Sequence, residues 1–188
     1  MDESSCAECS FENGMCGWAD VSNNGGLSYW RVTSLGAGGN VLSLGFNIVG
    51  SAVKLPTARV QTPVLGPSDA ACAVSFRYYI YSDYRPDDLH PYVSLMSLQL
   101  VLVKRAGAKA AQEFGPDDDQ LVLPDEKVIF STNNDTDWQS RQAVVLLGPL
   151  LRLYKLEFRA VQTLNTSTGS ISQEFRPQIW VDNITAIG

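Results

Sequence analysis

The sequence predicts an all-β fold, an antiparallel two-sheet β-sandwich. Most apolar clusters are about four to eight residues long and rich in Val, Ile, Leu, Phe and Tyr. Gly, Pro, Asn, Asp or Ser separates each cluster from the next, whereas helical periodicity is nearly absent. Nine such clusters are enough for two sheets, packed face to face with a shared core.

We expect nine strands along the chain. They lie near residues 29–34, 41–46, 58–61, 73–81, 93–104, 128–131, 138–146, 153–162 and 178–186. Two of them alternate clearly, which predicts one face toward a core and one toward solvent. Between 73 and 81 the apolar face carries Val74, Phe76, Tyr78 and Ile80, and the other carries Ser75, Arg77, Tyr79 and Tyr81. Between 156 and 161 Leu156, Phe158 and Ala160 alternate with Glu157, Arg159 and Val161.

The length of 188 residues fits one domain, which removes roughly 70% of the surface that its unfolded chain would expose. We assign residues 1–8 to an N-terminal extension and 9–188 to the domain. The least strand-like region, about 104–127, is interpreted as a long insertion loop. Such a loop is either a mobile surface segment or a segment that binds a partner.

Composition and charge exclude several classes of protein. The net charge of −6 and the absence of any basic run longer than Lys104-Arg105 argue against nucleic acid as a partner. No stretch reaches the 18 or more apolar residues of a membrane-spanning helix. We therefore predict no direct membrane insertion by this segment.

Three Asn-x-Ser/Thr sequons favour an extracellular setting. The residues 1–5 are acidic and polar and lack the layout of a signal peptide, which alone would suggest the cytosol. The sequons and the cysteines argue the other way, for a membrane-anchored or secreted protein. The predicted glycosylation sites are Asn134, Asn165 and Asn183.

The opening of the chain resembles the MAM domain, the adhesion module shared by meprins, neuropilins and receptor-type protein tyrosine phosphatases of the mu class. The matching residues are Cys9, Phe11, Glu12, Cys16, Gly17, Trp18, Asp20 and Trp30. The resemblance continues in Cys72, which leads an aromatic strand, and in Trp180-Val-Asp-Asn-Ile, which resembles the closing strand of the family. It implies a β-sandwich of jelly-roll type over nearly the whole chain.

The resemblance also implies how the four cysteines are used. Cys9 and Cys16 match the first disulfide of the family, and their short loop favours a structural staple. Cys72 matches the third cysteine, whose usual partner follows the last strand, but no further cysteine precedes Gly188. Either that partner lies beyond residue 188 or Cys6 replaces it, and we prefer a Cys6–Cys72 bond. The Cys6-x-x-Cys9 spacing lacks the second Cys pair or His cluster of a zinc site.

Some MAM domains hold a cation where the first strand, the loop after Gly-Trp and the last strand meet. By matching position, structural calcium would be bound by Glu12, Asp20 and Asp182. The alternative is that these acids cap turns. Asn183 replaces the usual second Asp, which removes one charge but leaves an amide oxygen that can coordinate calcium.

No pattern in the chain predicts an enzyme. The single His90 lies in a turn-rich loop, and there is no Gly-x-Ser-x-Gly elbow. A glycosidase needs two acids across a cleft, and none of the candidates lies in a strand motif that would project acids onto one face. We interpreted them as solvated loop residues: Asp87, Asp88, Asp117, Asp118, Asp119, Glu157 and Glu174.

The aromatic residues leave two interpretations open. Trp18, Trp30, Trp138 and Trp180 lie in or beside predicted strands, where core packing is favoured over a sugar-binding platform. Among the tyrosines, Tyr79 and Tyr84 are predicted as exposed contacts, since aromatic residues are enriched at recognition surfaces.

The function predicted from the sequence is a non-catalytic extracellular module for adhesion, receptor assembly or oligomerisation. Its partner would be a protein on the cell surface or in the extracellular matrix, with homophilic binding included. The alternative is a carbohydrate-binding or lectin-like jelly-roll module. A hydrolase of sandwich fold is a distant third interpretation.

Overall fold

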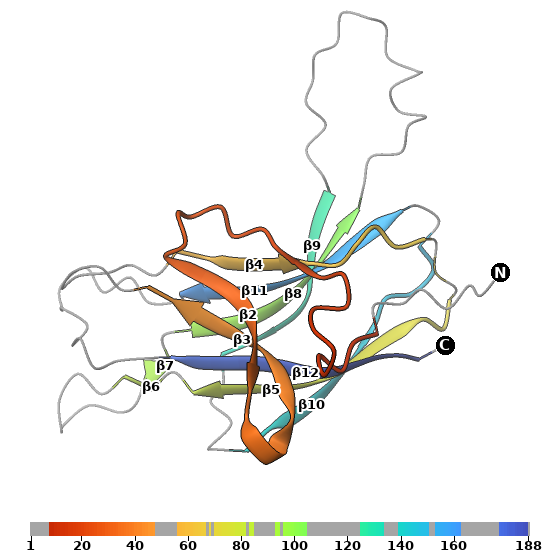
Figure 1. Ribbon diagram of the computed structural model, residues 1–188. Helices are drawn as coiled ribbons and strands as arrows, with labels where there is room; N and C mark the ends of the chain where they lie inside the picture. The colour runs from red at the N-terminus through yellow and green to blue at the C-terminus, as the bar shows by residue number, and fades with distance from the viewer. Residues whose placement is uncertain are drawn as a thin grey trace, which may run out of the picture.

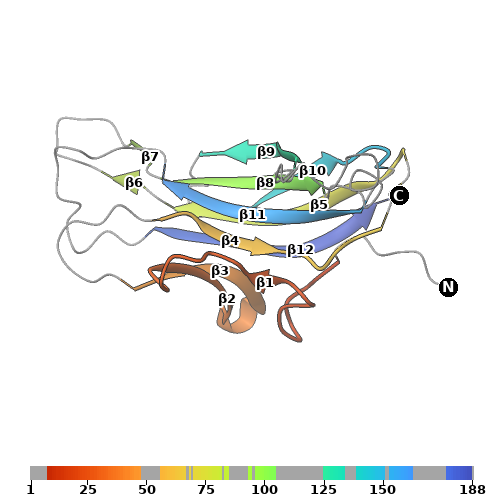
Figure 2. The ribbon, with the colours of Figure 1, turned by 90° about the horizontal axis from the view of Figure 1, so that it is seen from above.

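The computed structural model describes residues 8–47, 56–66, 68, 70–81, 83–84, 93–94, 96–104, 125–133, 139–150, 153–162 and 177–187. These residues form two antiparallel five-stranded sheets that pack as layers of a sandwich (Figures 1 and 2). The predicted fold class is confirmed. No helix in the described part of the chain is long and apolar enough to cross a membrane.

Neither sheet follows the order of the chain. Sheet I contains, from edge to edge, β1 (Ala19–Asp20), β4 (Ala58–Gln61), β11 (Tyr154–Gln162), β8 (Met96–Lys104) and β9 (Asp125–Thr132). Sheet II contains β10 (Arg141–Leu146), β5 (Ala73–Tyr81), β12 (Gln178–Ile187), β3 (Asn40–Phe46) and β2 (Ser28–Ser34). A small hairpin pairs β6 (Asp83–Tyr84) with β7 (Val93–Ser94), and a short 3-10 helix, η1 (Gly36–Gly38), joins β2 to β3.

The predicted strands are present, two of them with the expected bounds. β4 and β5 begin and end where the sequence pattern places them, at 58–61 and 73–81. The single strand predicted over 93–104 is two strands, β7 and β8. β9 begins at Asp125, so residues 125–127 belong to a strand and not to the predicted insertion. Residues 105–124 lie outside the described part.

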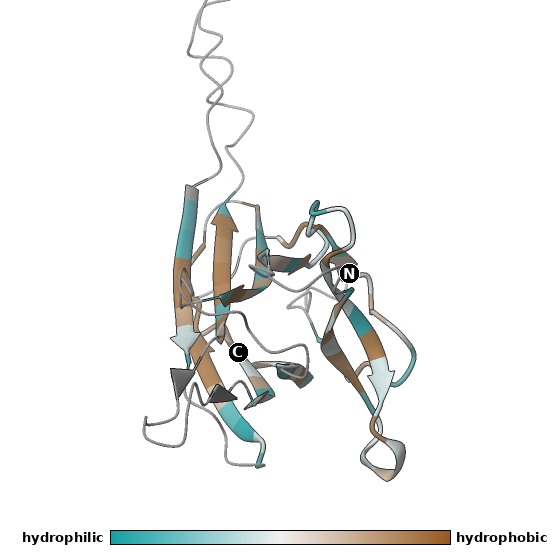
Figure 3. Cartoon of the chain, turned by 90° about the vertical axis from the view of Figure 1, so that its left-hand side faces the viewer, coloured by the Kyte–Doolittle hydropathy of each residue, from teal (hydrophilic) through white to brown (hydrophobic). Residues whose placement is uncertain are grey.

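The core forms where the inner faces of the two sheets meet. Phe76 of β5 contacts Phe158 of β11 edge-on, with ring centroids 5.0 Å apart. Phe130 of β9 meets the same Phe76 ring at 5.3 Å. Burial of such rings supplies most of the hydrophobic stabilisation of a sandwich. Figure 3 shows the matching pattern along β9, which begins with hydrophilic residues and is hydrophobic in its middle.

The N-terminal ring, closed by the Cys9–Cys16 disulfide, connects the two sheets. The Cα atoms of Cys9 and Cys16 are 5.7 Å apart, which confirms the predicted pair. Cys9 exchanges two backbone hydrogen bonds of 2.9 Å with Ile184 of β12. Just beyond the ring, Trp18 stacks on Phe158 of β11 with centroids 5.4 Å apart. Because Phe11 is fully buried as well, the opening motif is part of the core.

Candidate functional site

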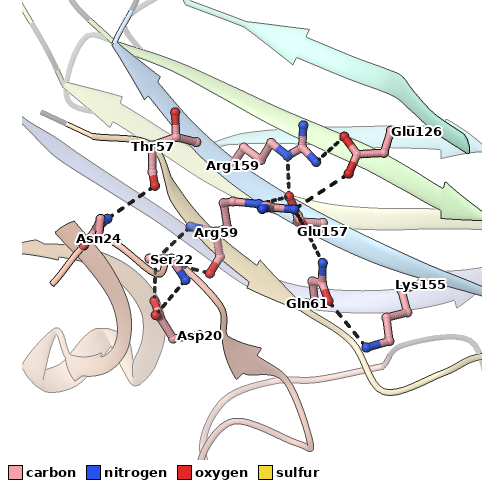
Figure 4. A network of polar contacts seen from close by, with 10 residues as sticks. All are labelled: Asp20, Ser22, Asn24, Thr57, Arg59, Gln61, Glu126, Lys155, Glu157 and Arg159. Atoms are coloured by element: carbon pink, nitrogen blue, oxygen red, sulfur yellow. Dashed lines mark hydrogen bonds and ion pairs between the residues drawn. The ribbon is translucent and has the colours of Figure 1, made fainter. Parts of the chain in front are cut away.

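The outer face of sheet I carries a charged cluster around Glu157. Leu156 and Phe158 point into the core, so Glu157 projects outward from β11. Arg59 of β4 binds its carboxylate in a bidentate way, through Nε at 2.8 Å and Nη2 at 3.0 Å. Arg159 and Gln61 donate further short hydrogen bonds to the same carboxylate. Figure 4 shows Glu157 enclosed by these three side chains.

Glu157 is fully buried although it points away from the core. Burial alone would raise the pKa of Glu157, but the hydrogen bonds from Arg59, Gln61 and Arg159 outweigh it. The pKa therefore lies below the ordinary value, and the carboxylate stays ionised at neutral pH. For Arg159, burial alone would lower the pKa, but hydrogen bonds to Glu126 and Glu157 raise it above its ordinary value.

The rim of this cluster is more open to solvent. Glu126 of β9 accepts a hydrogen bond of 2.8 Å from Nη2 of Arg159 and lies 3.7 Å from Nη2 of Arg59. Lys155 donates to the side-chain oxygen of Gln61 at 3.4 Å. We name the six side chains the Glu157 cluster: Arg59, Gln61, Glu126, Lys155, Glu157 and Arg159. Because three cations face two carboxylates, the cluster has an excess of positive charge.

Our interpretation of Glu157 as a solvated loop acid was wrong, because it is a buried residue of a central strand. Alternation correctly placed it on the outer face but says nothing about what covers that face. The same holds on β5, where outward-facing Ser75 and Tyr79 are buried. The other acids considered for glycosidase chemistry, together with His90 and Trp138, lie outside the described residues.

The outer face of sheet II carries aromatic rings. Trp180 of β12 lies opposite Tyr79 of β5, and the two rings stack with centroids 5.5 Å apart and planes 14° apart. Ile179 and Val181 are in the core, so Trp180 projects outward, where it is half-buried. Burial is the larger cause of the raised pKa of Tyr79, and nearby Tyr81 adds to it.

Polar groups lie next to this ring pair. Ser43 of β3 lies opposite Trp180 and also opposite Arg31 of β2. Two residues along the same strands, Arg77 of β5 forms an ion pair with Asp182 of β12. We name this surface the aromatic face: Tyr29, Arg31, Ser43, Arg77, Tyr79, Trp180 and Asp182.

A second ring is held flat at the far edge of the aromatic face. Tyr29 of β2 lies opposite Gly45 of β3, and a Cβ at Gly45 would be only 2.7 Å from Cε2 of the Tyr29 ring. The guanidinium carbon of Arg31 lies 5.9 Å from the centroid of Tyr29, which is within the range of a cation–π contact. The glycine therefore gives room for the ring to lie on the strand.

Two aromatic predictions need correction. Trp180 was assigned to the core, but it lies on the outer face; Trp18 and Trp30 are core residues, as predicted. Tyr79 was predicted as an exposed contact, but only 6% of it is exposed, because the Trp180 ring stacks on it. The side chain of Tyr84 lies outside the described residues.

The three predicted calcium ligands do not converge. Glu12 accepts a backbone hydrogen bond from Asn40, and Asp182 pairs with Arg77. Asp20 accepts hydrogen bonds from the backbone N–H of Trp30 at 2.6 Å and from Ser22, so it fixes the turn after the Gly-Trp motif. The described residues contain no group of three or more acids, His or Cys suited to a metal. Calcium binding stays a prediction, and no step of the proposed function depends on it.

The second disulfide also stays a prediction. Cys72 is buried and directly precedes Ala73, which lies opposite Ile187 near the end of β12. Glu8 contacts the backbone N–H of neighbouring Ala186 at 3.4 Å. Cys6 lies outside the described residues, so the Cys6–Cys72 bond is not tested.

Of the three sequons, only that of Asn183 is described. Asn183 is exposed at an irregularity of β12 between Asp182 and Thr185, with a φ of 48°. Asn tolerates this left-handed conformation better than most residues. Its glycosylation stays a prediction, and Asn134 and Asn165 lie outside the described part.

The contacts of the arginines on the two outer faces were not predicted from the sequence. Arg59, Arg77 and Arg159 each lie on the outward-facing phase of a strand, where we expected solvated side chains. The acidic partners of Arg59 and Arg77 are 98 and 105 residues away in the chain, so only the strand order brings them together, whereas Glu157 is two residues from Arg159. The one available signal was an acid flanked by outward-facing bases on a strand, Lys155-x-Glu157-x-Arg159.

Comparison with known proteins supports the fold. No protein-family model and no curated protein matches the chain. Among solved structures, the K1 cleaved adhesin domain of Lys-gingipain from Porphyromonas gingivalis W83 is similar at 18% identity, over 96% of each chain, with a TM-score of 0.51. A non-crystalline cellulose-specific carbohydrate-binding module, CBM28, is similar at 15% identity, over 97% of this chain and 94% of that one, with a TM-score of 0.53.

A third similar structure is the CBM22-2 xylan-binding domain of Paenibacillus barcinonensis Xyn10C. It shares 12% identity over 96% of this chain and 98% of that chain, with a TM-score of 0.50. At these identities the similarity shows the fold alone. The chain thus has the β-sandwich fold that carbohydrate-binding modules and adhesin domains also have, while the MAM resemblance stays a prediction.

Proposed function

We propose that this chain is a non-catalytic extracellular module that binds carbohydrate through its aromatic face. The observation that carries the proposal is the half-buried Trp180 ring, held parallel to Tyr79 on the outer face of a sheet. A flat, rigid ring of this kind offers an apolar surface to the C–H face of a sugar, and it loses little conformational entropy on binding. The Cys9–Cys16 disulfide agrees with an extracellular setting.

The polar groups around Trp180 would form hydrogen bonds that fix the orientation of the bound sugar. A sugar on the ring would meet Ser43 and Arg31 across the sheet and the Arg77–Asp182 pair along the strands. Such a combination of an apolar platform with a few placed hydrogen-bonding groups is typical of small-ligand sites. The carbohydrate-binding structures of the same fold support this choice over a protein partner.

The chemistry of Glu157 argues against glycosidase activity. A glycosidase needs one carboxylic acid with a raised pKa to protonate the leaving group. The pKa of Glu157 is lowered by its partners: Oε1 accepts from Arg59 and Arg159, and Oε2 accepts from Arg59 and Gln61. It therefore acts as a fixed anion within the sheet and not as a proton donor.

The test is glycan binding by a Trp180→Ala variant. Wild-type protein is screened against neutral cello- and xylo-oligosaccharides by isothermal titration calorimetry and on a glycan array. We expect Trp180→Ala to lower the affinity at least about fivefold, since stacking on one ring is worth roughly 1–3 kcal/mol where it has been measured for planar ligands. Leu146→Ala is the matched control, because Leu146 is 75% exposed on β10 of the same sheet.

Two results would contradict the proposal. One is a wild-type protein that binds no glycan in either assay. The other is glycan binding that Trp180→Ala and Leu146→Ala leave equally intact, because the ligand would then lie away from the aromatic face.

A second candidate function is protein adhesion, as the MAM resemblance implies. The observation that favours it is an exposed apolar strip beside the aromatic face: Leu146 and Ile187 both lie opposite Ala73, and each is at least 47% exposed. Adjacent exposed apolar side chains are typical of protein contacts. Self-association measured by sedimentation, and abolished by Leu146→Asp but not by Trp180→Ala, would favour this function.

A further inference from the structure

The arginine pair of the Glu157 cluster has unused hydrogen-bond donors. A guanidinium group carries five N–H donors. Arg59 and Arg159 each use Nε and Nη2, toward Glu157 and Glu126, whereas no residue in the described ranges accepts from either Nη1. The side chains are 36% and 18% exposed, respectively, so these donors face solvent at the surface of sheet I.

The buried Glu157 carboxylate holds both guanidinium groups in place. The fully buried Glu157 carboxylate accepts from Nε of Arg59 and from Nε of Arg159. The two arginines also lie directly opposite each other in the register of β11 and β4. Two guanidinium groups on facing positions of adjacent strands would repel each other without the carboxylate between them. Glu157 therefore organises a fixed pair of forked donors that suits a carboxylate.

The chain already places one carboxylate on this pair. Glu126 touches Nη2 of both arginines, and its side chain is 36% exposed. It comes from β9, which β8 separates from β11, and it is not enclosed by the arginines as Glu157 is. A carboxylate held in this way at the surface contributes little to stability. An external carboxylate of the same geometry would compete with it for the arginines.

We propose that the Arg59–Arg159 pair is a second binding site, which binds the carboxylate of an acidic sugar such as a uronic acid. The choice of a sugar over an acidic peptide depends on the proposed function. It is also favoured by the neighbouring side chains, since Gln99 of β8 lies opposite Arg159 and Ser131 of β9 lies opposite Gln99. This polar row offers hydrogen bonds to sugar hydroxyls.

Replacing Glu126 is expected to strengthen the binding of an acidic sugar, not to weaken it. If Glu126 occupies the place of the ligand, then Glu126→Gln removes a competing charge and strengthens binding of an acidic sugar. We expect a gain of about fivefold, the factor that corresponds to one exposed ion pair. Glu8→Gln is the matched control, because it changes the net charge equally at an exposed residue next to β12.

The experiment titrates wild type, Glu126→Gln and Glu8→Gln with tri-galacturonic acid by calorimetry at low and at physiological salt. The methyl ester of the same trisaccharide is the neutral probe, and it should bind no variant more tightly than wild type. Arg159→Lys in the Glu126→Gln background should lose the gain, since Lys keeps the charge but not the fork. The comparison of Glu126→Gln with Glu8→Gln needs no arginine substitution, so it stays decisive if Arg159→Lys is unstable.

Three outcomes would overturn the inference. Equal affinities of Glu126→Gln and Glu8→Gln would show that Glu126 does not compete for the site. An equal gain for the methyl ester would exclude carboxylate recognition. An equal gain for a tri-glutamate peptide would show that the site has no preference for a sugar.

Trp180→Ala separates this inference from the proposed function. Binding of tri-galacturonic acid should be unchanged in this variant, because Trp180 lies on the other sheet. If the variant loses that binding, the acid binds at the aromatic face, so the second site fails while the proposed function stands. If neutral glycans fail to bind but the Glu126→Gln gain remains, the proposed function fails and the arginine site stands.

Discussion

The two outer faces of the sandwich come from the same strand alternation but hold opposite kinds of side chain. On sheet I, Arg59 and Arg159 enclose the Glu157 carboxylate, which is fully buried, and their remaining donors face solvent. On sheet II, the Tyr79–Trp180 stack leaves a half-buried ring at the surface. A buried charge is tolerated only with a paired opposite charge, whereas an aromatic ring needs no partner. The charged face therefore encloses its central anion and offers cationic donors to solvent, whereas the aromatic face keeps an apolar ring at the surface.

The largest expected effect tests the charged face. Glu157→Gln leaves two guanidinium groups without their shared anion. We expect the free energy of unfolding, measured by urea denaturation at pH 7, to fall by about 3 kcal/mol, the lower end for breaking a buried pair, because the arginines are partly exposed. Glu126→Gln is the control, and it should cost less than about 1 kcal/mol. Equal costs for the two variants would show that burial of Glu157 has no energetic consequence.

The pH dependence of stability tests the same carboxylate without changing its shape. The pKa of Glu157 in the folded state lies below its ordinary value of 4.5. Its contribution is therefore complete above that value and is lost as the pH falls through the folded-state pKa. The difference in unfolding free energy between wild type and Glu157→Gln should shrink between about pH 5 and pH 3. A difference that stays constant over this range would contradict the lowered pKa.

Removal of the Cys9–Cys16 disulfide tests whether the two sheets respond differently when the N-terminal ring is opened. Replacing Cys9 and Cys16 together by Ser should lower the free energy of unfolding by about 2–3 kcal/mol, the loop-closure value for a ring of this size. Because Cys9 bonds to Ile184 of β12, hydrogen exchange should accelerate at the Ile184 amide. The Leu156 amide of β11, which donates to Thr62 Oγ1, should stay protected. Equal acceleration at both amides would show that the ring supports both sheets alike.

The smallest expected effect tests the support of the aromatic face. Gly45→Ala would put a Cβ 2.7 Å from the Tyr29 ring, which must then move. We expect a cost of about 1–3 kcal/mol in unfolding free energy, as for other overpacked sites, together with weaker glycan binding. Gly66→Ala is the control, since no neighbouring atom lies within 4 Å of its Cβ position. If both variants bind glycan like wild type, Tyr29 is not part of the binding surface.

The sequence predicted local features well. The bounds of β4 and β5 and the Cys9–Cys16 bond follow from residue type and short spacing, which need no knowledge of distant strands. The opening motif was also found, but its role was not. Asp20 fixes a turn through the Trp30 backbone, and Trp18 packs on Phe158. A motif identifies which residues matter, whereas their contacts depend on the strands that pack beside them.

By itself, the sequence determined the all-β class, the phase of β5 and β11 and the short disulfide ring, because alternation and turn residues act over a few positions. The tertiary structure alone decided which outward residues meet. Arg59 and Glu157 are 98 residues apart, and Arg77 and Asp182 are 105 apart. They become neighbours because each sheet orders its strands out of sequence. Such pairing depends on the packing of the whole core, which no local pattern encodes.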